Sequence, residues 1–233
     1  MKHAAYCGTR EIYDDMEMSA KSLIANSSVD RVHFIIEDAE FPHELPDIIQ
    51  VHDVSRQTWF KPDSPNMSSR YTYMAMMRIA LCHVLSDVDT VLSLDADTVC
   101  LENIDSVWDT PLDGCYLAAC EEWHRSKSGL QYCNFGVVLY NLAKLRDGKA
   151  DECIDVLNTS YFEWVEQDVG NYLCQGRIKA LPSCFNSNWW TDKNAPGARI
   201  FHYAGVKRED WVDMPTPSMY RGMSWDEVMR LHG

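Results

Sequence analysis

A short apolar run at residues 91–94 ends in two aspartates that are one residue apart, Asp95 and Asp97. Apolar runs of this length with β-branched members are typical of buried strands. Side chains alternate along an extended chain, so the two carboxylates point to the same side, about 7 Å apart along the backbone. Ligands bind at the carboxyl ends of strands in open α/β sheets, and paired carboxylates suit Mg²⁺ or Mn²⁺, which would neutralise a pyrophosphate. The alternative is a strand that simply ends in a polar turn.

Strand-like and helix-like segments alternate ahead of this run. Residues 4–7, 32–36 and 48–54 predict strands, and apolar side chains recur at helical spacing over residues 12–24. This alternation favours βαβ units, so we predict an α/β fold with a mostly parallel sheet. The sequence has no repeat, low-complexity tract or linker, so one domain over residues 1–233 is expected. The remaining expected elements are strands at 116–119, 132–140 and 178–181, and helices at 70–85, 142–146, 150–157, 164–173 and after the capping box that begins at Ser224.

The predicted helix at residues 70–85 carries a charge on its apolar face. At about 100° per residue, apolar side chains such as Tyr71 and Leu81 form one stripe, and Arg78 falls in its middle. An unpaired buried charge is prohibitively costly, so this guanidinium must meet an anion. Its partner is either a structural carboxylate, or a ligand, or one of the two aspartates at the end of the strand that follows.

The composition limits the classes of function. The 233 residues include 35 acidic and 21 basic side chains, a net charge of -14, which argues against nucleic acid or an anionic membrane surface as the main partner. No run approaches the ~20 apolar residues of a membrane span, and the N-terminal apolar stretch is too short for a signal peptide. Nine cysteines without a C-x-x-C pair argue against a disulfide framework or a zinc site and favour a reducing compartment. We therefore expect a cytoplasmic protein.

Residues 201–208 place a histidine, a glycine and two cations close together. A neutral imidazole at His202 is a good third protein ligand for Mn²⁺ beside two carboxylates. Gly205 lets the backbone approach a phosphate, and Lys207 or Arg208 would balance the phosphate charge. The alternative for His202 is a structural histidine whose hydrogen bonds are satisfied within the fold.

Two other polar groups have both a functional and a structural interpretation. Glu166 and Asp168 flank Gln167 near the start of the predicted helix at 164–173, where acidic side chains also favour the helix dipole. Asn134 lies near the start of a predicted strand, where it would simply make a turn hydrogen bond.

Taken in order, these stretches resemble the retaining nucleotide-sugar glycosyltransferases of family 8, the group of glycogenin, galactinol synthase and lipopolysaccharide galactosyltransferases. The resemblance covers nearly the whole chain. The matching motifs are the nucleobase loop at 9–13, the helix after it at 20–23, the segment at 73–81 with Arg78, the D-x-D motif at 94–98, the N-x-G strand from Asn134, the acidic-Gln-Asp sequence at 166–168 and the H-x-x-G motif from His202. The sequence departs from the family six residues after this histidine, where lysine is usual: Lys207 is at five and Arg208 at six.

The resemblance implies a GT-A type, Rossmann-like sheet flanked by helices, with a nucleotide-binding part at about 1–100 and a donor-sugar and acceptor part at about 101–233. It implies a hexosyltransferase that moves glucose or galactose from UDP-glucose or UDP-galactose with retained anomeric configuration. The acceptor, whether a glycan, a glycosylated protein or a small molecule, is not defined by the sequence. Loops at 55–69, 121–131 and 185–197 would form its site, where Trp123, Trp189 and Trp190 either stack on a sugar or close the core.

The same resemblance assigns roles to individual residues. Asp95, Asp97 and His202 would hold Mn²⁺, with Mg²⁺ as the alternative, and the metal would stabilise the leaving diphosphate. Gln167 would lie beneath the anomeric carbon as a catalytic residue beside Glu166, either as nucleophile or as a stabiliser of charge. The donor would be contacted by Thr9, Tyr13, Arg78, Asp95, Ala96, Asp97, Asn134, Glu166, Gln167, Gly205, and Lys207 or Arg208.

Two rival functions come from other classes. In a haloacid-dehalogenase-like phosphatase, Asp95 would be the nucleophile and Asp97 the general acid. That motif normally lies on the first strand of its domain, whereas several predicted elements precede it here, and no G-D-x-x-x-D follows. The second rival is a non-catalytic protein that binds sugar or nucleotide on the same fold.

Overall fold

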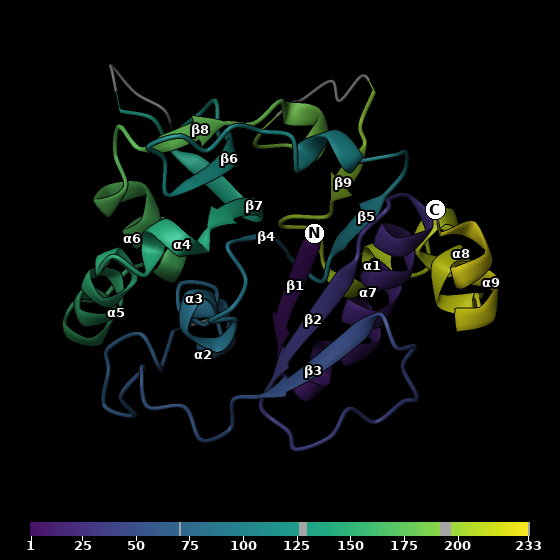
Figure 1. Ribbon diagram of the computed structural model, residues 1–233, viewed down its shortest axis with the longest axis horizontal. Coiled ribbons are helices and arrows are strands. Elements are labelled where there is room, and N and C mark those ends of the chain that lie inside the picture. Colours follow the sequence, from purple (N-terminus) through teal and green to yellow (C-terminus); the bar gives the residue numbers. More distant parts are fainter. Residues whose placement is uncertain (70, 126–129, 192–196, 233) are drawn as a thin grey trace.

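The computed structural model describes residues 1–69, 71–125, 130–191 and 197–232. Within them, seven strands form one sheet in the order β3-β2-β1-β4-β7-β6-β8 (Figure 1). The strands are β1 (His3–Gly8), β2 (Arg31–Ile36), β3 (Ile49–Asp53), β4 (Thr90–Leu94), β6 (Leu117–Glu121), β7 (Cys133–Asn141) and β8 (Ile178–Ala180). β1 is parallel to β2 and β4, β2 to β3, and β6 to β8, whereas β7 is antiparallel to β4 and β6. The predicted α/β class and mostly parallel sheet are confirmed.

Apolar side chains on both faces of these strands build two cores. Along β1, Ala4 and Tyr6 belong to one core and Ala5 to the other; along β4, Leu92 belongs to the first and Val91 to the second. Successive side chains of a strand alternate, so a strand buried on both faces needs a continuous apolar run. These runs are what made the central strands recognisable in the sequence.

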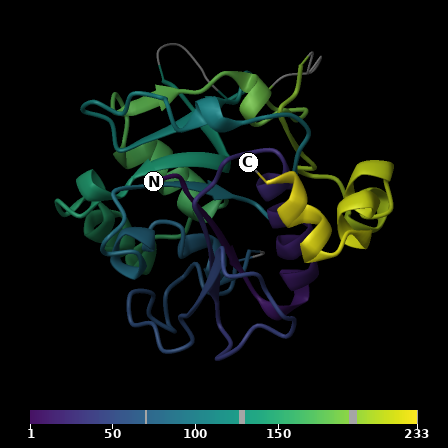
Figure 2. The same cartoon turned by 45° about the vertical axis from the view of Figure 1, so that its right-hand side comes forward.

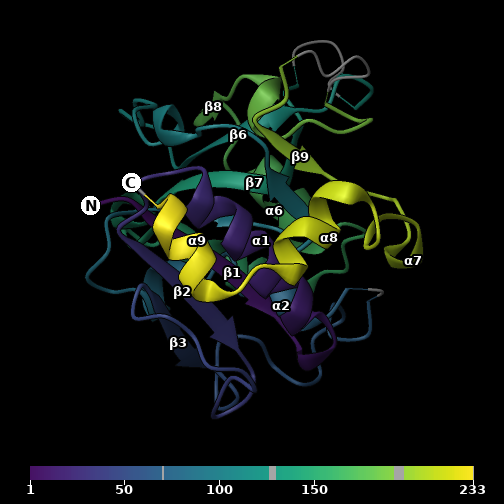
Figure 3. The ribbon, with the colours of Figure 1, turned by 90° about the vertical axis from the view of Figure 1, so that its right-hand side faces the viewer.

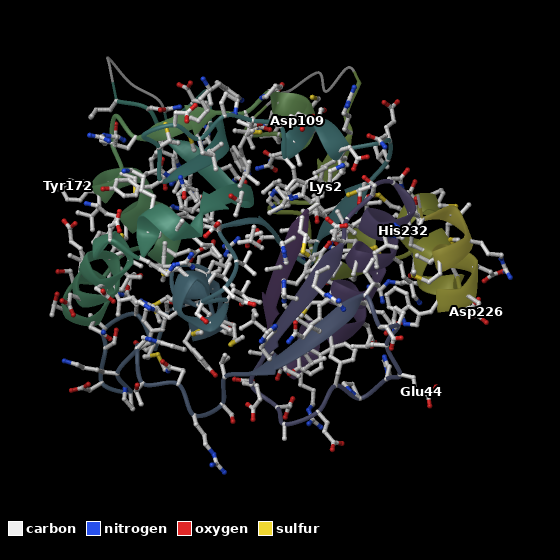
Figure 4. All side chains as sticks on the ribbon, in the orientation of Figure 1. Lys2, Glu44, Asp109, Tyr172, Asp226 and His232 are labelled. Atoms are coloured by element: carbon white, nitrogen blue, oxygen red, sulfur yellow. The ribbon has the colours of Figure 1, made fainter. Side chains whose placement is uncertain are left out.

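Helices cover both faces of the sheet. On one face lies α1 (Tyr13–Ala25), and Figure 2 and Figure 3 show α8 (Pro215–Gly222) and α9 (Trp225–Leu231) packed against it. The other face carries α2 (Tyr73–Met76), α3 (Leu81–Val84), α4 (Leu142–Leu145), α5 (Lys149–Thr159) and α6 (Val165–Leu173). Side chains fill the space between these layers, whereas Glu44, Tyr172 and Asp226 project outward from the rim (Figure 4). No helix in the described parts of the chain is long and apolar enough to cross a membrane.

The prediction of a single helix at residues 70–85 is wrong. Two four-residue helices, α2 and α3, take its place, and residue 70 lies outside the described residues. Between them Ile79 N–H donates to Met76 O at 3.0 Å, a bond that reaches three residues back, as in a 3₁₀ turn. Arg78 lies in this tighter turn. The charge that interrupts the apolar stripe therefore also marks where the regular helix is interrupted.

The sequence did not predict a second, two-stranded sheet. β5 (Thr98–Cys100) pairs antiparallel with β9 (Ile200–His202), and Thr98 stands opposite His202. Strands of three residues are too short for hydrophobic periodicity to identify. The pairing joins two segments far apart in the sequence and brings His202 beside the D-x-D motif.

Three histidines form a hydrogen-bonded row across β1, β2 and β3. His3 Nδ1 lies 3.0 Å from His33 Nε2, and His33 Nδ1 lies 3.0 Å from His52 Nε2. His33 is 3% exposed, and burial, together with the neighbouring His52 and His3, lowers its pKa to about 3. Burial also lowers the pKa values of His3 and His52. The row is therefore neutral in the folded protein at pH 7.

We expect this row to make the fold sensitive to mild acid. Below the unfolded histidine pKa of about 6.5, the unfolded chain binds a proton that folded His33 refuses until the pH approaches its own lowered pKa. Folding stability should therefore fall as the pH decreases from 6.5, by about 2–3 kcal/mol for His33 alone at pH 4.5. Urea unfolding of wild type and His33→Phe from pH 4.5 to 7.5 measures this. Equal pH dependence in the two proteins would contradict the expectation.

Candidate active site

A cavity of about 670 Å³ opens at the carboxyl ends of β1 and β4 and beside the start of β7. Its lining comes from segments far apart in the sequence: the D-x-D turn after β4, the first residues of α6, and the turn between β9 and α7 (Arg208–Trp211). Residues predicted for the site that line it are Arg78, Asp95, Ala96, Asp97, Asn134, Glu166, Gln167, His202, Gly205 and Arg208.

Asp95, Asp97 and His202 come together on one side of the cavity. One ligand atom from each of them lies within 4.8 Å of the others. His202 Nε2 is 3.3 Å from Asp97 Oδ1 and 3.5 Å from Asp95 Oδ2. Two carboxylates with one imidazole form a donor set that fits Mn²⁺, and Mg²⁺ is compatible with the carboxylates.

The ionisation of this cluster favours a cation in its centre. Burial raises the pKa of Asp95, and the Asp97 charge adds to that rise against the opposing effects of Arg78 and His202. Burial alone would raise the pKa of Asp97, but His202 outweighs it and the pKa is lowered. Burial alone would lower the pKa of His202, but Asp97 and Asp95 raise it. A divalent cation between these groups would stabilise both carboxylates in their charged form.

Gly136 of β7 is needed for the position of the His202 ring. A Cβ atom added to this glycine would lie 2.0 Å from His202 Cε1 and 2.3 Å from Nδ1, much closer than atoms can approach. The imidazole therefore packs directly against the β7 backbone. This contact gives a physical reason for the glycine of the N-x-G motif.

Arg78 pairs with two carboxylates, one of the two aspartates that the sequence suggested and Glu166. Its Nη1 donates to Asp95 Oδ1 at 2.6 Å and to Phe135 O at 2.6 Å, and its Nη2 donates to Glu166 Oε1. Burial alone would lower the pKa of this guanidinium, but the charges of Asp95 and Glu166 outweigh it and raise the pKa. The buried cation thus links the cluster of Asp95, Asp97 and His202 to α6.

Glu166 has one carboxylate oxygen left over. The side chain is 2% exposed, and among the described residues its Oε2 has no hydrogen-bond partner. Burial raises the pKa of Glu166 to about 7 even though Arg78 opposes the rise. The preceding residue, Val165, has a φ of 28°, a strained value for a β-branched side chain. Strain and an unsatisfied buried acid are both typical of functional sites.

The Gln167 amide is held at both ends. Its Oε1 accepts from Phe135 N–H at 2.9 Å, and its Nε2 donates to Tyr132 Oη at 3.1 Å and to Glu122 Oε1 at 3.4 Å. A backbone N–H can only donate, so the oxygen of the amide is identified unambiguously. Asn134 does make the turn hydrogen bond that the sequence suggested, since its Oδ1 accepts from Gly136 N–H at 2.9 Å.

The structure brings Arg208, but not Lys207, into the cavity lining. Arg208 Nε and Nη2 donate to the buried carboxylate of Asp15 at 2.7 and 3.1 Å. The Lys207 side chain is 77% exposed and lies 3.9 Å from Glu209. Of these two cations, Arg208 is thus the one that lines the cavity.

Besides Lys207, two predicted donor contacts lie outside the cavity lining. Thr9 and Tyr13 do not line it, and Tyr13 Oη instead donates to Asp38 at 2.9 Å. From this part of the chain, Ile12 and Asp15 line the cavity.

Other lining residues were not named in the sequence analysis, although Glu122 and Arg125 fall in the loop that it predicted for the acceptor at 121–131. Glu122 and Arg125 line the cavity beyond the end of β6. The signal for Glu122 was present, because it follows an apolar strand just as Asp95 does. Of the three tryptophans in the predicted acceptor loops, Trp123 and Trp189 are 48% and 60% exposed and do not close the core, while Trp190 lines the cavity.

Comparison with known proteins finds glycosyltransferases among the relatives of this sequence. The chain is 24% identical to a putative glycosyltransferase of Haemophilus influenzae over 194 residues, 73% of this chain and 58% of that protein. It is 26% identical to the lipopolysaccharide 1,2-glucosyltransferase of Escherichia coli over 163 residues, 58% of this chain and 48% of that protein. The matches therefore span only about half the length of these curated relatives.

Among solved structures, galactosyltransferase LgtC in complex with donor and acceptor sugar analogues is similar to the whole fold. It superposes with a TM-score of 0.68 at 19% identity, covering 94% of this chain and 95% of that one. The sheet and its flanking helices thus form a GT-A fold. The model of glycosyl transferase family 8 matches residues 3–207, nearly the whole of the chain from β1 to the turn that carries Lys207. The protein belongs to glycosyl transferase family 8.

Proposed function

We propose that the protein is a metal-dependent, retaining hexosyltransferase that uses UDP-glucose or UDP-galactose as donor. The observation that carries this proposal is one cavity that holds both the Asp95–Asp97–His202 cluster and Gln167. Membership of the family supports the transferase activity. The proposal includes a nucleotide-binding part at about 1–100 and a donor-sugar and acceptor part at about 101–233 of a single domain.

A divalent cation, Mn²⁺ or Mg²⁺, would neutralise the charge that grows on the leaving diphosphate. The chain would hold that ion through Asp95, Asp97 and the Nε2 atom of His202. Arg208 would add a guanidinium on the phosphate side, and its ion pair with Asp15 would fix its direction.

The donor hexose would lie against α6. Glu166 Oε2 is buried and lacks a partner among the described residues, so it would accept from a sugar hydroxyl. Gln167 would lie beneath the anomeric carbon. Both ends of its amide already make hydrogen bonds, which favours a fixed dipole that stabilises positive charge over a nucleophile. The leaving phosphate would then take the proton of the acceptor hydroxyl.

The acceptor would enter beside Trp190 and Arg125, which line the cavity on the side of the β6–β7 and β8–β9 loops. LgtC was solved with an acceptor sugar analogue, which favours a saccharide here as well. Arg125 lies over the Trp164 ring with its guanidinium 4.5 Å from the ring centroid.

Slow hydrolysis of the donor tests the proposal without knowledge of the acceptor. We expect release of hexose from UDP-glucose or UDP-galactose that depends on Mn²⁺. Hydrolysis of p-nitrophenyl phosphate with Mg²⁺, in the absence of UDP-sugar hydrolysis, would instead support the phosphatase. UDP binding with no turnover of any UDP-sugar would support a non-catalytic binding protein. The anomer first released, read from NMR coupling constants, tests retention.

Gln167→Ala should lower kcat for donor hydrolysis about 10²–10³-fold and leave KM nearly unchanged. An oriented dipole that acts mainly on the transition state is worth about 3–4 kcal/mol, by analogy with a lost oxyanion-hole donor. Gln175→Ala, the same change at an exposed position beyond α6, is the matched control. A rise in KM without loss of kcat would place Gln167 in ground-state binding instead.

A further inference from the structure

A continuous path of hydrogen bonds connects His202, on one side of the cavity, with Gln167 of α6. His202 Nδ1 lies 2.8 Å from Asn186 Oδ1, and Asn186 Nδ2 donates to Asn134 Oδ1 at 2.9 Å. Asn134 Nδ2 donates to Glu122 Oε1 at 2.9 Å, and Gln167 Nε2 reaches the same oxygen at 3.4 Å. The path therefore runs from a metal-ligand histidine to the residue proposed to lie beneath the anomeric carbon.

Backbone N–H groups fix the direction of these bonds, because they can only donate. Gly136 N–H donates to Asn134 Oδ1 at 2.9 Å, so the Asn134 amide must turn its NH₂ group toward Glu122. Trp190 N–H donates to Asn188 Oδ1 at 2.8 Å, so the Asn188 amide turns its NH₂ group toward Asn186 Oδ1, 3.0 Å away. The carboxylate of Glu122 is the acceptor at the end of the path.

The direction of these bonds determines where the His202 proton lies. The NH₂ group of Asn186 is used by Asn134, and its oxygen accepts from Asn188, so that oxygen also faces His202 as an acceptor. Nδ1 lies 2.8 Å from this oxygen and 3.5 Å from the NH₂ group of Asn188, so the shorter contact assigns the ring a proton on Nδ1. Its Nε2 atom is then left to face the two aspartates, as a ligand of a metal requires.

Burial makes a reversal of these bonds costly. The exposed fractions are 0% for Asn186, 7% for Asn134, 3% for Glu122 and 4% for His202. Turning either amide around would place oxygen against oxygen or leave a buried donor unsatisfied, at a cost of about 1–3 kcal/mol for each group. The path therefore maintains one direction of donation.

We propose that Asn186 and Glu122 are positioning residues that hold His202 in its metal-binding tautomer and couple it to Gln167. Asn186 acts directly by accepting the Nδ1 proton. Glu122 acts through Asn134. Its carboxylate oxygen accepts from the NH₂ groups of both Asn134 and Gln167 and so keeps these two amides turned toward it. The inference rests on the proposed metal-dependent function. Of its two tests, only the second, the affinity for Mn²⁺, requires that function to be correct.

The first readout uses metal-free protein labelled with ¹⁵N at histidine. We expect the His202 Nδ1–H group in wild type to give an NMR signal protected from exchange with solvent. Asn186→Leu has nearly the same volume but no acceptor, and should lose this signal. Asn66→Leu is the matched control, since Asn66 is also 0% exposed but bonds to backbone oxygens of Leu157 and Ser160. It should keep the signal even if it lowers stability.

The second readout is calorimetric affinity for Mn²⁺ in the presence of UDP. Loss of the group that orients a ligating histidine typically weakens metal binding about 10–100-fold, and we expect this for Asn186→Leu. Glu122→Gln keeps an acceptor oxygen toward Asn134 and should bind Mn²⁺ nearly as wild type does. Glu122→Leu removes the acceptor and should weaken Mn²⁺ binding about tenfold or more.

Three results would overturn the proposal: an unprotonated Nδ1 in wild type, wild-type Mn²⁺ affinity in folded Asn186→Leu, or equal losses in Glu122→Gln and Glu122→Leu. If Asn186→Leu does not fold, the wild-type signal and the two Glu122 variants still decide the question. Wild type that fails to bind Mn²⁺ with UDP would instead contradict the proposed function, while the Nδ1 signal would still test the direction of the path.

Discussion

Asp97→Asn is expected to weaken Mn²⁺-dependent binding of UDP at least about a hundredfold. Removal of a group that only orients a metal ligand typically weakens metal binding about 10–100-fold, and removal of a ligand itself should weaken it more. Asp97 is the clearest of the three ligands to change. Asp95 also pairs with Arg78, and the His202 ring packs against β7, so their replacement disturbs more of the fold.

Calorimetry of UDP binding with and without Mn²⁺ measures this effect. Asp105→Asn is the matched control, because the Asp105 side chain is 29% exposed against 31% for Asp97 and lies outside the cavity lining. The control should bind Mn²⁺ and UDP as wild type does. Unchanged Mn²⁺-dependent affinity in Asp97→Asn would contradict the proposed metal site. Because the nucleotide completes the coordination, Mn²⁺ alone should bind only weakly even to wild type.

Arg78→Met should destabilise the fold by about 3–5 kcal/mol and abolish donor turnover. Arg78 is 7% exposed and its guanidinium pairs with both Asp95 and Glu166, so its removal leaves two carboxylates close together and partly desolvated. Urea unfolding measures the loss of stability. Arg177→Met, at an exposed arginine, should change the free energy of unfolding by only about 0.5 kcal/mol.

The pH dependence separates this electrostatic cause from a packing defect. The pKa of Glu166, about 7 in wild type, should rise further without the guanidinium. A carboxyl whose folded pKa lies above its unfolded value stabilises the fold most at low pH, and that stability is lost as the pH rises through the folded pKa. Arg78→Met should therefore be less destabilised at pH 5 than at pH 8. A loss that is independent of pH would contradict this cause.

The central strands and the D-x-D site could be predicted because their signal is local. A strand buried on both faces is apolar throughout, and the two aspartates that follow β4 line the cavity. The same logic identified Arg78 as a charge with an anionic partner. It left open a structural carboxylate, a ligand or an aspartate at the strand end, and the structure shows bonds to Asp95 and to Glu166.

What could not be predicted depends on contacts between distant segments. The break between α2 and α3 accompanies hydrogen bonds that periodicity does not encode, and β5 and β9 are too short to recognise alone. The role of Glu122 depends on Asn134 and Gln167, which belong to β7 and α6. Lys207 and Arg208 are adjacent in sequence, and it is the ion pair with buried Asp15 and the place in the cavity lining that distinguish Arg208.

The pairing of β5 with β9 has a consequence for the order of folding. Asp95 and Asp97 are in place once β4 joins the sheet, but His202 arrives only when a segment near the other end of the chain pairs with β5. Contacts between residues so far apart in sequence are costly in chain entropy and tend to form late. A chain with only its first strands assembled would thus hold two of the three proposed metal ligands. Metal and nucleotide would bind the completed fold and stabilise by mass action the contact that closes it.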